Sequence, residues 1–171
     1  MTRQKDDWYP TPHTAIKSLL DVEVFDPVIW EPAAGDGAIS KVLELACYEV
    51  VSQDLNDYGY CASGLDFLMA TEREADCLVT NPPYKLAQQF IEHAIGLGVK
   101  KHAWLLRLSF LEGRGRFLEL FDHYPPSRIH VFSKRLTIWR GGEKPSGTGT
   151  TAYAWFVWNS NYNGVPQLGW I

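Results

Sequence analysis

Strand-like and helix-like stretches alternate along most of this 171-residue chain, and this alternation limits the possible folds more than any other feature. Short apolar runs predict strands at residues 27–30, 49–53, 64–68, 77–80, 102–108, 128–132 and 152–158. Apolar residues at helical spacing predict helices at residues 13–20, 38–47, 86–95 and 116–123. We therefore expect an α/β fold with one doubly wound, mostly parallel sheet of seven strands and helices on both faces.

Length and composition predict one domain over residues 1–171. A hydrophobic content of 46% in a chain of this length is enough for one core with two faces, and the chain is too short for two ordinary domains. No run of 18 apolar residues and no secretory signal is present, so we expect a cytoplasmic protein, a monomer or weak dimer. Cys47, Cys61 and Cys77 have no partner at metal-ligand spacing, and we expect no metal.

Charge is distributed unevenly, although the formal net charge is only -4. Residues 1–84 contain 5 Lys and Arg against 15 Asp and Glu, whereas residues 85–171 contain 11 against 5. The second half therefore carries a charge of +6. A local positive field can attract a polyanion even when the whole molecule is acidic, but a solvated surface without a partner fits composition equally well.

A loop of small residues at 31–37 follows the first predicted strand and leads into a helix. Gly35 and Gly37 allow a ligand to approach the backbone N–H groups at the helix start. Ser40 stands where the dinucleotide fingerprint needs a third glycine, which disfavours an NAD site. Asp54 ends the second strand, where an acidic residue binds the ribose hydroxyls of nucleotide-like cofactors.

Asp66 and Phe67 follow the third predicted strand and form a second candidate cofactor contact. The Asp66 carboxylate could accept a hydrogen bond from an adenine amine, and the Phe67 ring could lie against the base. Singly, Asp54 and Asp66 are more often strand-end caps than ligands. Their order and spacing favour ligands.

Asn81, Pro82, Pro83 and Tyr84 directly follow the strand predicted at 77–80 and form the candidate catalytic loop. The lone pair of an exocyclic amine on adenine is delocalised into the ring, so an enzyme must accept hydrogen bonds from its hydrogens. The Asn81 side-chain oxygen and the Pro82 carbonyl are two such acceptors. Tyr84 offers a face on which an extruded base can stack. A proline pair can also merely end a strand, and a tyrosine beside it can be core.

With these motifs the chain resembles the amino-methyltransferases that use S-adenosylmethionine, and more closely the DNA adenine-N6 group, which includes small phage-borne members. The resemblance rests on residues 9–12, 31–37, 54, 66–67 and 81–84, in that order, and covers essentially the whole chain. It implies a Rossmann-like class I methyltransferase with an antiparallel last strand, a 1–25 segment that contributes to the cofactor site, and no metal. The residues it places near the cofactor are Tyr9, Thr11, Pro12, Glu31, Ala33, Gly35, Gly37, Asp54, Leu55, Asp66, Phe67 and Asn81.

One departure concerns target recognition. Many DNA methyltransferases of this group carry a large recognition domain after the core, whereas here the residues beyond Tyr84 are nearly all needed to finish the sheet. We expect recognition by loops 109–116 and 133–150, and hence a short or relaxed sequence preference. The candidate DNA contacts are Arg114, Arg116, Lys134, Arg135, Trp139, Arg140 and Lys144, although Trp139 also fits a core position.

Three other functions remain as alternatives. The same acceptor loop suits an amine of an RNA base or of a protein glutamine, although glutamine-directed relatives usually have an N-terminal helical recognition domain. A non-catalytic module that binds S-adenosylmethionine would not require the intact loop. Cytosine-C5 chemistry is excluded, because it needs a cysteine nucleophile, usually after proline, and none of the three cysteines follows a proline.

Overall fold

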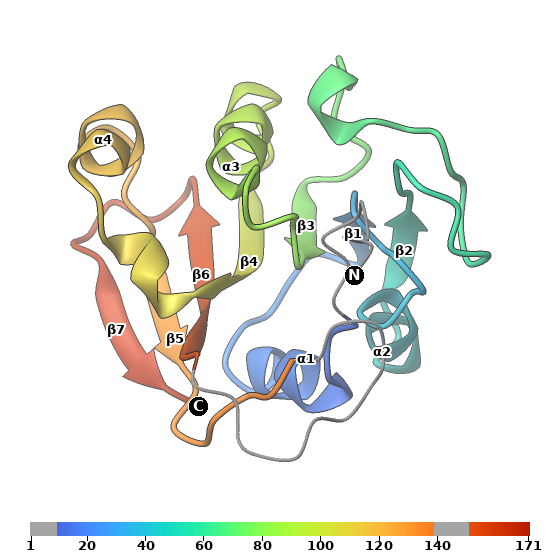
Figure 1. Cartoon of the computed structure of the whole chain (residues 1–171), viewed down its shortest axis with the longest axis horizontal. Helices are drawn as coiled ribbons and strands as arrows, with labels where there is room; N and C mark the ends of the chain where they lie inside the picture. The colour runs from blue at the N-terminus through green and yellow to red at the C-terminus, as the bar shows by residue number, and fades with distance from the viewer. Residues whose placement is uncertain (1–9, 139–150) are drawn as a thin grey trace, which may run out of the picture.

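The computed structural model describes residues 10–138 and 151–171 (Figure 1). The helical elements are α1 (His13–Leu20), α2 (Ser40–Leu45), η1 (Phe67–Met69), α3 (Ala87–Gly96), η2 (Leu108–Leu111), α4 (Arg114–Arg116) and η3 (Phe117–Phe121). The strands are β1 (Val28–Glu31), β2 (Glu49–Ser52), β3 (Cys77–Thr80), β4 (Lys101–Arg107), β5 (Arg128–Val131), β6 (Tyr153–Asn159) and β7 (Gln167–Trp170). In this part of the chain no helix has the length and apolarity needed to cross a membrane.

Within the described ranges, seven strands form one sheet in the order β2-β1-β3-β4-β6-β5-β7. Strands β1 to β4 are parallel, and β6 lies antiparallel between β4 and β5. The expected seven-stranded, mostly parallel sheet with an antiparallel strand over 152–158 is therefore confirmed. Because β2 lies on one side of β1 and β3 on the other, the connections diverge between β1 and β3. In open α/β sheets, ligands bind at such a switch point.

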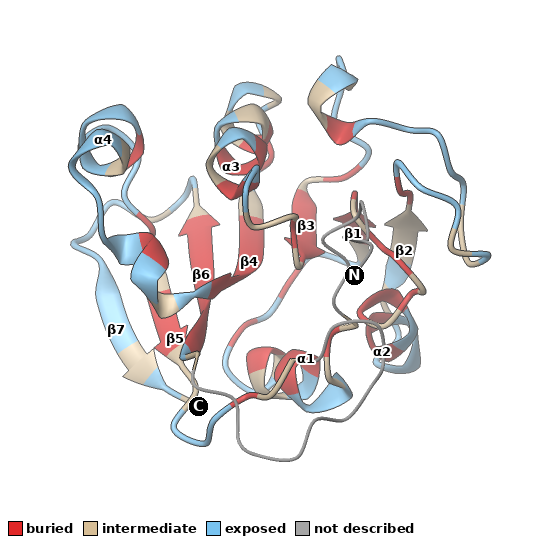
Figure 2. Cartoon of the chain, viewed as in Figure 1, coloured by how far each residue is buried: buried red, intermediate tan, exposed pale blue. Residues whose placement is uncertain are grey.

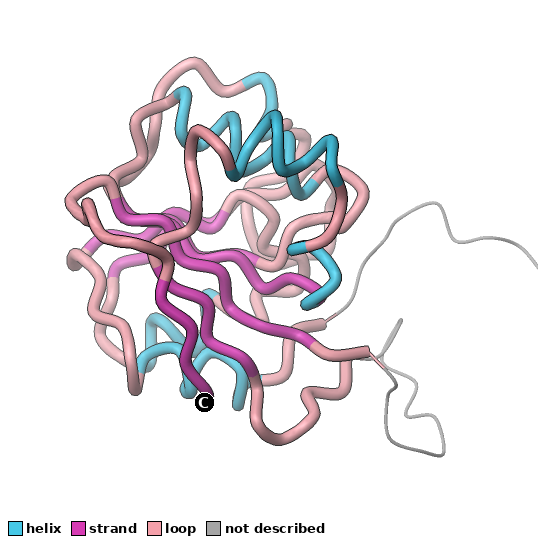
Figure 3. The backbone as a smooth tube through the Cα atoms, turned by 90° about the vertical axis from the view of Figure 1, so that its left-hand side faces the viewer, coloured by secondary structure: helices cyan, strands magenta, loops and turns pink. Residues whose placement is uncertain are grey.

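Helices cover both faces of the sheet (Figure 3). Neighbouring side chains of β4 point to opposite faces: Trp104 and Leu106 pack in the core under α3, whereas Ala103 and Leu105 pack in the core over α1 and α2. The central strands are consequently buried along nearly their whole length (Figure 2). This burial explains why they read as continuous apolar runs in the sequence.

One predicted strand is absent and one observed strand was not predicted, both near the edges of the sheet. Residues 64–68 do not form a strand: the Asp66 carboxylate accepts a hydrogen bond from the Leu68 N–H at 3.0 Å and starts the short turn η1. Such a local side-chain contact competes with sheet pairing. The seventh strand is instead β7, which pairs in parallel with β5. It was not predicted because it is short, contains Gly169 and is mostly exposed.

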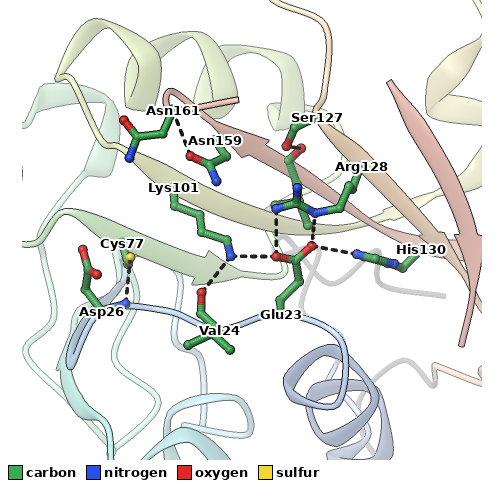
Figure 4. A network of polar contacts seen from close by, with 11 residues as sticks. Glu23, Val24, Asp26, Cys77, Lys101, Ser127, Arg128, His130, Asn159 and Asn161 are labelled. Carbon is green, nitrogen blue, oxygen red and sulfur yellow. Dashed lines mark hydrogen bonds and ion pairs between the residues drawn. The ribbon is translucent and has the colours of Figure 1, made fainter. Parts of the chain in front are cut away.

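A buried ion cluster connects the segment before β1 to the amino-terminal ends of β4 and β5 (Figure 4). The Glu23 carboxylate lies 2.6 Å from Lys101 Nζ and 2.8 Å from His130 Nε2, and it also binds the Arg128 guanidinium. Burial alone would raise the pKa of Glu23, but hydrogen bonds from His130, Arg128 and Lys101 outweigh burial and hold it well below its usual range. The cluster lies at the amino-terminal ends of these strands, whereas the switch point lies at the carboxyl ends.

We expect Glu23→Gln to lower the free energy of unfolding by about 3 kcal/mol, because it leaves mostly buried cations without their carboxylate. A depressed folded-state pKa also means that the stabilisation is present above the ordinary glutamate value of 4.5 and is lost progressively as pH falls from there towards the folded-state pKa. Urea unfolding at pH 7 and at about pH 3 measures both effects. The matched control is Glu49→Gln, at an exposed carboxylate without a described partner. Equal loss in both variants would contradict a stabilising role of the cluster.

Candidate active site

A cleft of about 380 Å³ opens at the carboxyl ends of β1, β2 and β3, at the switch point of the sheet. Its walls come from four segments that are distant in the sequence: residues 10–11, the loop after β1, the segment after β2 and the loop after β3. The candidate cofactor loop and the candidate catalytic loop therefore face one cavity.

Asp54 shapes the cofactor side of this cleft. Its carboxylate accepts hydrogen bonds from the Gly35 N–H at 2.9 Å and from the Asn56 N–H at 2.8 Å. These contacts join the end of β2 to the loop after β1. Each carboxylate oxygen has a second lone pair, so Asp54 can cap the loops and still accept a ligand hydroxyl.

Gly37 has a different role from Gly35. Its φ is +79°, and a Cβ there would lie 2.5 Å from the Tyr60 ring. Glycine is thus required by the left-handed backbone and by the packing of Tyr60. Gly37 itself does not line the cleft, whereas Gly35 does.

Glu31 ends β1 and places a buried carboxyl group in the cleft wall. It is 1% exposed and accepts a hydrogen bond from the Ser40 hydroxyl at the start of α2. Burial raises the pKa of Glu31 well above its usual value, and nearby Asp54 and Asp36 raise it further. A cationic ligand in the cleft would counteract both effects and favour the ionised carboxylate.

Asn81 is oriented by a residue 70 positions earlier in the chain. Its side-chain Nδ2 donates to the Thr11 hydroxyl at 3.1 Å. Because the amide oxygen and nitrogen point to opposite sides of the group, this bond turns the Asn81 oxygen away from Thr11. Thr11 lies just before α1, which is held against the sheet by a 2.8 Å bond from Trp155 Nε1 to the Ala15 carbonyl.

Tyr84 is the last residue of the candidate catalytic loop and is half-buried. Its ring lies 6.1 Å from that of Tyr153, and the Arg107 guanidinium lies over it at 5.1 Å. Burial raises the pKa of the Tyr84 hydroxyl, so it stays protonated at neutral pH. The residue is suited to packing against a ligand and unsuited to acting as a base.

Most of the residues predicted for the cofactor site and the catalytic loop line the cleft. Its lining includes Thr11, Glu31, Ala33, Gly35, Asp54 and Leu55 from the cofactor set, together with Asn81, Pro82, Pro83 and Tyr84. Pro12 precedes α1 and does not line the cleft. Tyr9 lies outside the described residues.

Asp66 and Phe67 do not join this cleft, so the structure does not place them for cofactor contact. Phe67 is 1% exposed and packs in the core, with ring centroids 5.0 Å from Trp30 and 4.9 Å from Phe90. Asp66 caps η1 and lines a separate shallow depression. The order of residues along the chain could not reveal that the Phe67 side chain turns inward.

The candidate recognition residues are scattered. Arg114, Lys134 and Arg135 are exposed and do not line this cleft. They do not line a second cleft beside Tyr84 either, whereas Arg116 does. Trp139, Arg140 and Lys144 lie outside the described residues.

Sequence reasoning did not single out several residues that line the cleft, among them Asp36, Asn56, Tyr58 and Lys85. Asn56 and Tyr58 lie within four residues after Asp54, and this closeness in sequence to a candidate ligand was the available signal. Lys85 directly follows the catalytic loop. Among the described residues, no three His, Cys, Asp or Glu side chains gather as a metal site.

No protein-family model and no curated protein matches the chain, but solved structures do. A modification subunit assigned to a type I restriction enzyme of Vibrio vulnificus has a TM-score of 0.61, with 10% identity over 96% of this chain and 47% of the subunit. A SAM-dependent O-methyltransferase of Thermotoga maritima has a TM-score of 0.54, with 16% identity over 89% of this chain and 66% of that one.

A protein assigned as an RNA methyltransferase in Pyrococcus horikoshii has a TM-score of 0.60, with 15% identity over 86% of this chain and 80% of that one. The chain has the fold of SAM-dependent methyltransferases. It spans about half the length of the Vibrio subunit. At these identities the likeness establishes the fold, and the activity has to be argued from the site.

The cleft fits S-adenosylmethionine in charge and donor set. This cofactor carries a sulfonium and an ammonium cation, and the cleft wall contains the carboxyl groups of Glu31, Asp36 and Asp54. It also carries ribose hydroxyls, for which a strand-end carboxylate such as Asp54 is a suitable acceptor.

We expect S-adenosylmethionine to bind more tightly as pH rises above the ordinary glutamate value of 4.5, because a bound cation favours release of the proton that burial holds on Glu31. Calorimetry in two buffers of different ionisation enthalpy measures both the dissociation constant and the released proton. Glu31→Gln should remove this part of the pH dependence, and Glu49→Gln should retain it. Identical pH profiles for wild type and Glu31→Gln would contradict the coupling.

Proposed function

We propose that this protein transfers a methyl group from S-adenosylmethionine to the N6 amino group of adenine in DNA, after extrusion of the base from the duplex. One observation carries the proposal: the Asn81–Tyr84 loop forms a wall of the same cleft that contains Glu31, Gly35 and Asp54. A methyl donor bound at the strand ends would then lie next to a methyl acceptor bound by the loop.

The loop supplies what a weakly nucleophilic amine needs. The Asn81 oxygen and the Pro82 carbonyl accept hydrogen bonds from the two amine hydrogens and favour a tetrahedral nitrogen. The bond from Asn81 Nδ2 to Thr11 fixes the amide nitrogen towards Thr11 and so assigns the acceptor role to the amide oxygen. This preorganisation lowers the barrier because the dipoles need no rearrangement during the reaction.

The remaining residues bind and align the reactants. S-adenosylmethionine, when bound, supplies an electrophilic methyl group. Asp54 accepts from its ribose hydroxyls, Glu31 stabilises its positive charge, and Tyr84 stacks against the target base. The N–C bond would form as the S–C bond of the cofactor breaks, S-adenosylhomocysteine would leave, and the methylated nitrogen would lose one proton to solvent. Rate then depends on alignment of nitrogen, methyl and sulfur, and no covalent nucleophile is required.

DNA is favoured over other acceptors by two observations. The residues after Tyr84 carry a charge of +6, which suits a polyanion. The Vibrio structure with this fold is a modification subunit assigned to a restriction enzyme. The Pyrococcus structure makes an RNA base the second candidate. We propose methylation in a short or relaxed sequence context, because the positive charge after Tyr84 suits phosphate contacts, which carry no sequence information.

Transfer of a labelled methyl group from S-adenosylmethionine tests the proposal directly. The acceptor panel contains duplex DNA, single-stranded DNA, RNA and a glutamine-rich protein, and nucleoside analysis identifies the product. We expect N6-methyladenine in DNA. If only RNA or only protein is labelled, that molecule is the substrate and DNA is not. Cofactor binding without transfer to any acceptor would favour a non-catalytic module.

We expect Asn81→Ala to raise the activation barrier of methyl transfer by about 2–4 kcal/mol and so to slow the reaction, because it removes one preorganised acceptor. Thr11→Val keeps the shape of the threonine but removes the hydroxyl that orients Asn81, so it should lower the rate by a smaller factor. Single-turnover kinetics with saturating cofactor measure both. Calorimetry should show nearly unchanged S-adenosylmethionine affinity for Asn81→Ala. Wild-type turnover by this variant would eliminate the mechanism.

A further inference from the structure

A second cleft of about 360 Å³ lies beside the catalytic loop, between the start of α3 and the segment that follows β4. Tyr84 and Lys85 line both clefts. The catalytic loop is therefore a wall shared by the cofactor cleft and this second cleft. A substrate that stacks on Tyr84 would have its neighbouring atoms within reach of the second cleft.

The two clefts differ in charge. The cofactor cleft contains the carboxyl groups of Glu31, Asp36 and Asp54, with Lys85 as the cation in its lining. The described lining of the second cleft contains Lys85, Arg107 and Arg116 and no carboxylate. The catalytic loop thus separates a negative cleft, which suits a cationic donor, from a positive cleft, which suits an anion.

Arg107 is a cation of the second cleft with N–H donors that are not used by described residues. It is exposed at the end of β4, and its guanidinium lies over the Tyr84 ring at 5.1 Å. Within residues 10–138 and 151–171, its side chain makes no hydrogen bond and no ion pair. A planar guanidinium whose N–H groups have no acceptor in the protein can present two parallel N–H donors to a phosphate.

Arg116 has a different role, because its guanidinium is anchored to the protein through Nη1. Its Nη1 donates to the Phe110 carbonyl at 2.7 Å and to the Glu112 carbonyl at 2.6 Å, and the guanidinium stacks on the Phe110 ring at 4.1 Å. Its Nε is buried and has no acceptor among the described residues. Arg116 therefore builds the wall of the second cleft and adds positive charge to it.

From this geometry we propose that the second cleft binds a backbone phosphate next to the target base, with Arg107 as the main ligand and Lys85 beside it. The inference rests on the proposed function. A base and its flanking phosphates belong to the same stretch of strand, so an anion site must lie close to the stacking ring, and Arg107 meets this condition. Arg107 is a substrate-positioning residue that also specifies the acceptor as a nucleotide chain. A glutamine side chain would have no use for this anion site.

The test uses short DNA strands with one adenine in which each phosphate beside the target is replaced, one at a time, by an uncharged methylphosphonate. Fluorescence anisotropy with bound S-adenosylhomocysteine measures DNA affinity, and single-turnover transfer measures the rate. The proteins compared are wild type, Arg107→Gln, Arg107→Lys and Lys17→Gln. The last variant removes the same charge from an exposed position on α1 that lines neither cleft.

We expect one methylphosphonate position to weaken binding to wild type and Lys17→Gln by about tenfold or more, as for loss of a charged hydrogen bond. Arg107→Gln should bind unmodified DNA about tenfold more weakly and be insensitive to that same replacement. Arg107→Lys should retain part of the affinity for unmodified DNA and part of the sensitivity to the replacement. If Arg107 merely supported the Tyr84 ring, Arg107→Gln would slow all strands equally and stay sensitive to the replacement.

Failure of this inference can be told apart from failure of the proposed function. Wild-type methylation of DNA adenine without coupling between Arg107 and any flanking phosphate would overturn the phosphate site alone. An acceptor panel that yields only methylated protein would overturn both. Unchanged cofactor affinity of Arg107→Gln, measured by calorimetry, would show that the variant is folded and its cofactor cleft intact.

Discussion

The pairing of β1 with both β2 and β3 is the constraint on which the candidate site depends. The chain places β2 on one side of β1 and then crosses back to place β3 on the other, so the loops that leave β1 and β3 diverge. The space between these loops is the cleft. A different neighbour for β1 would separate Gly35 from Asn81, even if every local element were unchanged.

Two polar contacts between distant segments then fix the site within this frame. Asp54 joins the loop after β1 to the end of β2, and Thr11 joins the segment before α1 to Asn81. Both lie in partly or fully buried surroundings, where a hydrogen bond is stronger and an unsatisfied group more costly than in water. The Glu23 cluster connects segments at the opposite, amino-terminal ends of the strands. The groups that stabilise the fold there are therefore different from those that line the candidate site.

Local charge matters more here than net charge. The formal charge of -4 would disfavour a nucleic-acid substrate if it were spread evenly. Instead, carboxylates line the cofactor cleft, while Lys85, Arg107 and Arg116 line the second cleft. Low-dielectric walls reduce screening between such groups and their ligands, so oppositely charged reactants can be directed to the two sides of one loop.

The sequence alone determined the α/β alternation, the bounds of β3 and α1, and the positions of Asp54 and Asn81 at strand ends, because hydrophobic periodicity and turn chemistry are local properties. Tertiary structure decided the rest. An edge strand as short and exposed as β7 is defined by its partner β5, and the inward turn of Phe67 depends on space left by other elements. The placement of Arg107 over the Tyr84 ring likewise arises from the pairing of remote strands, which no local pattern encodes.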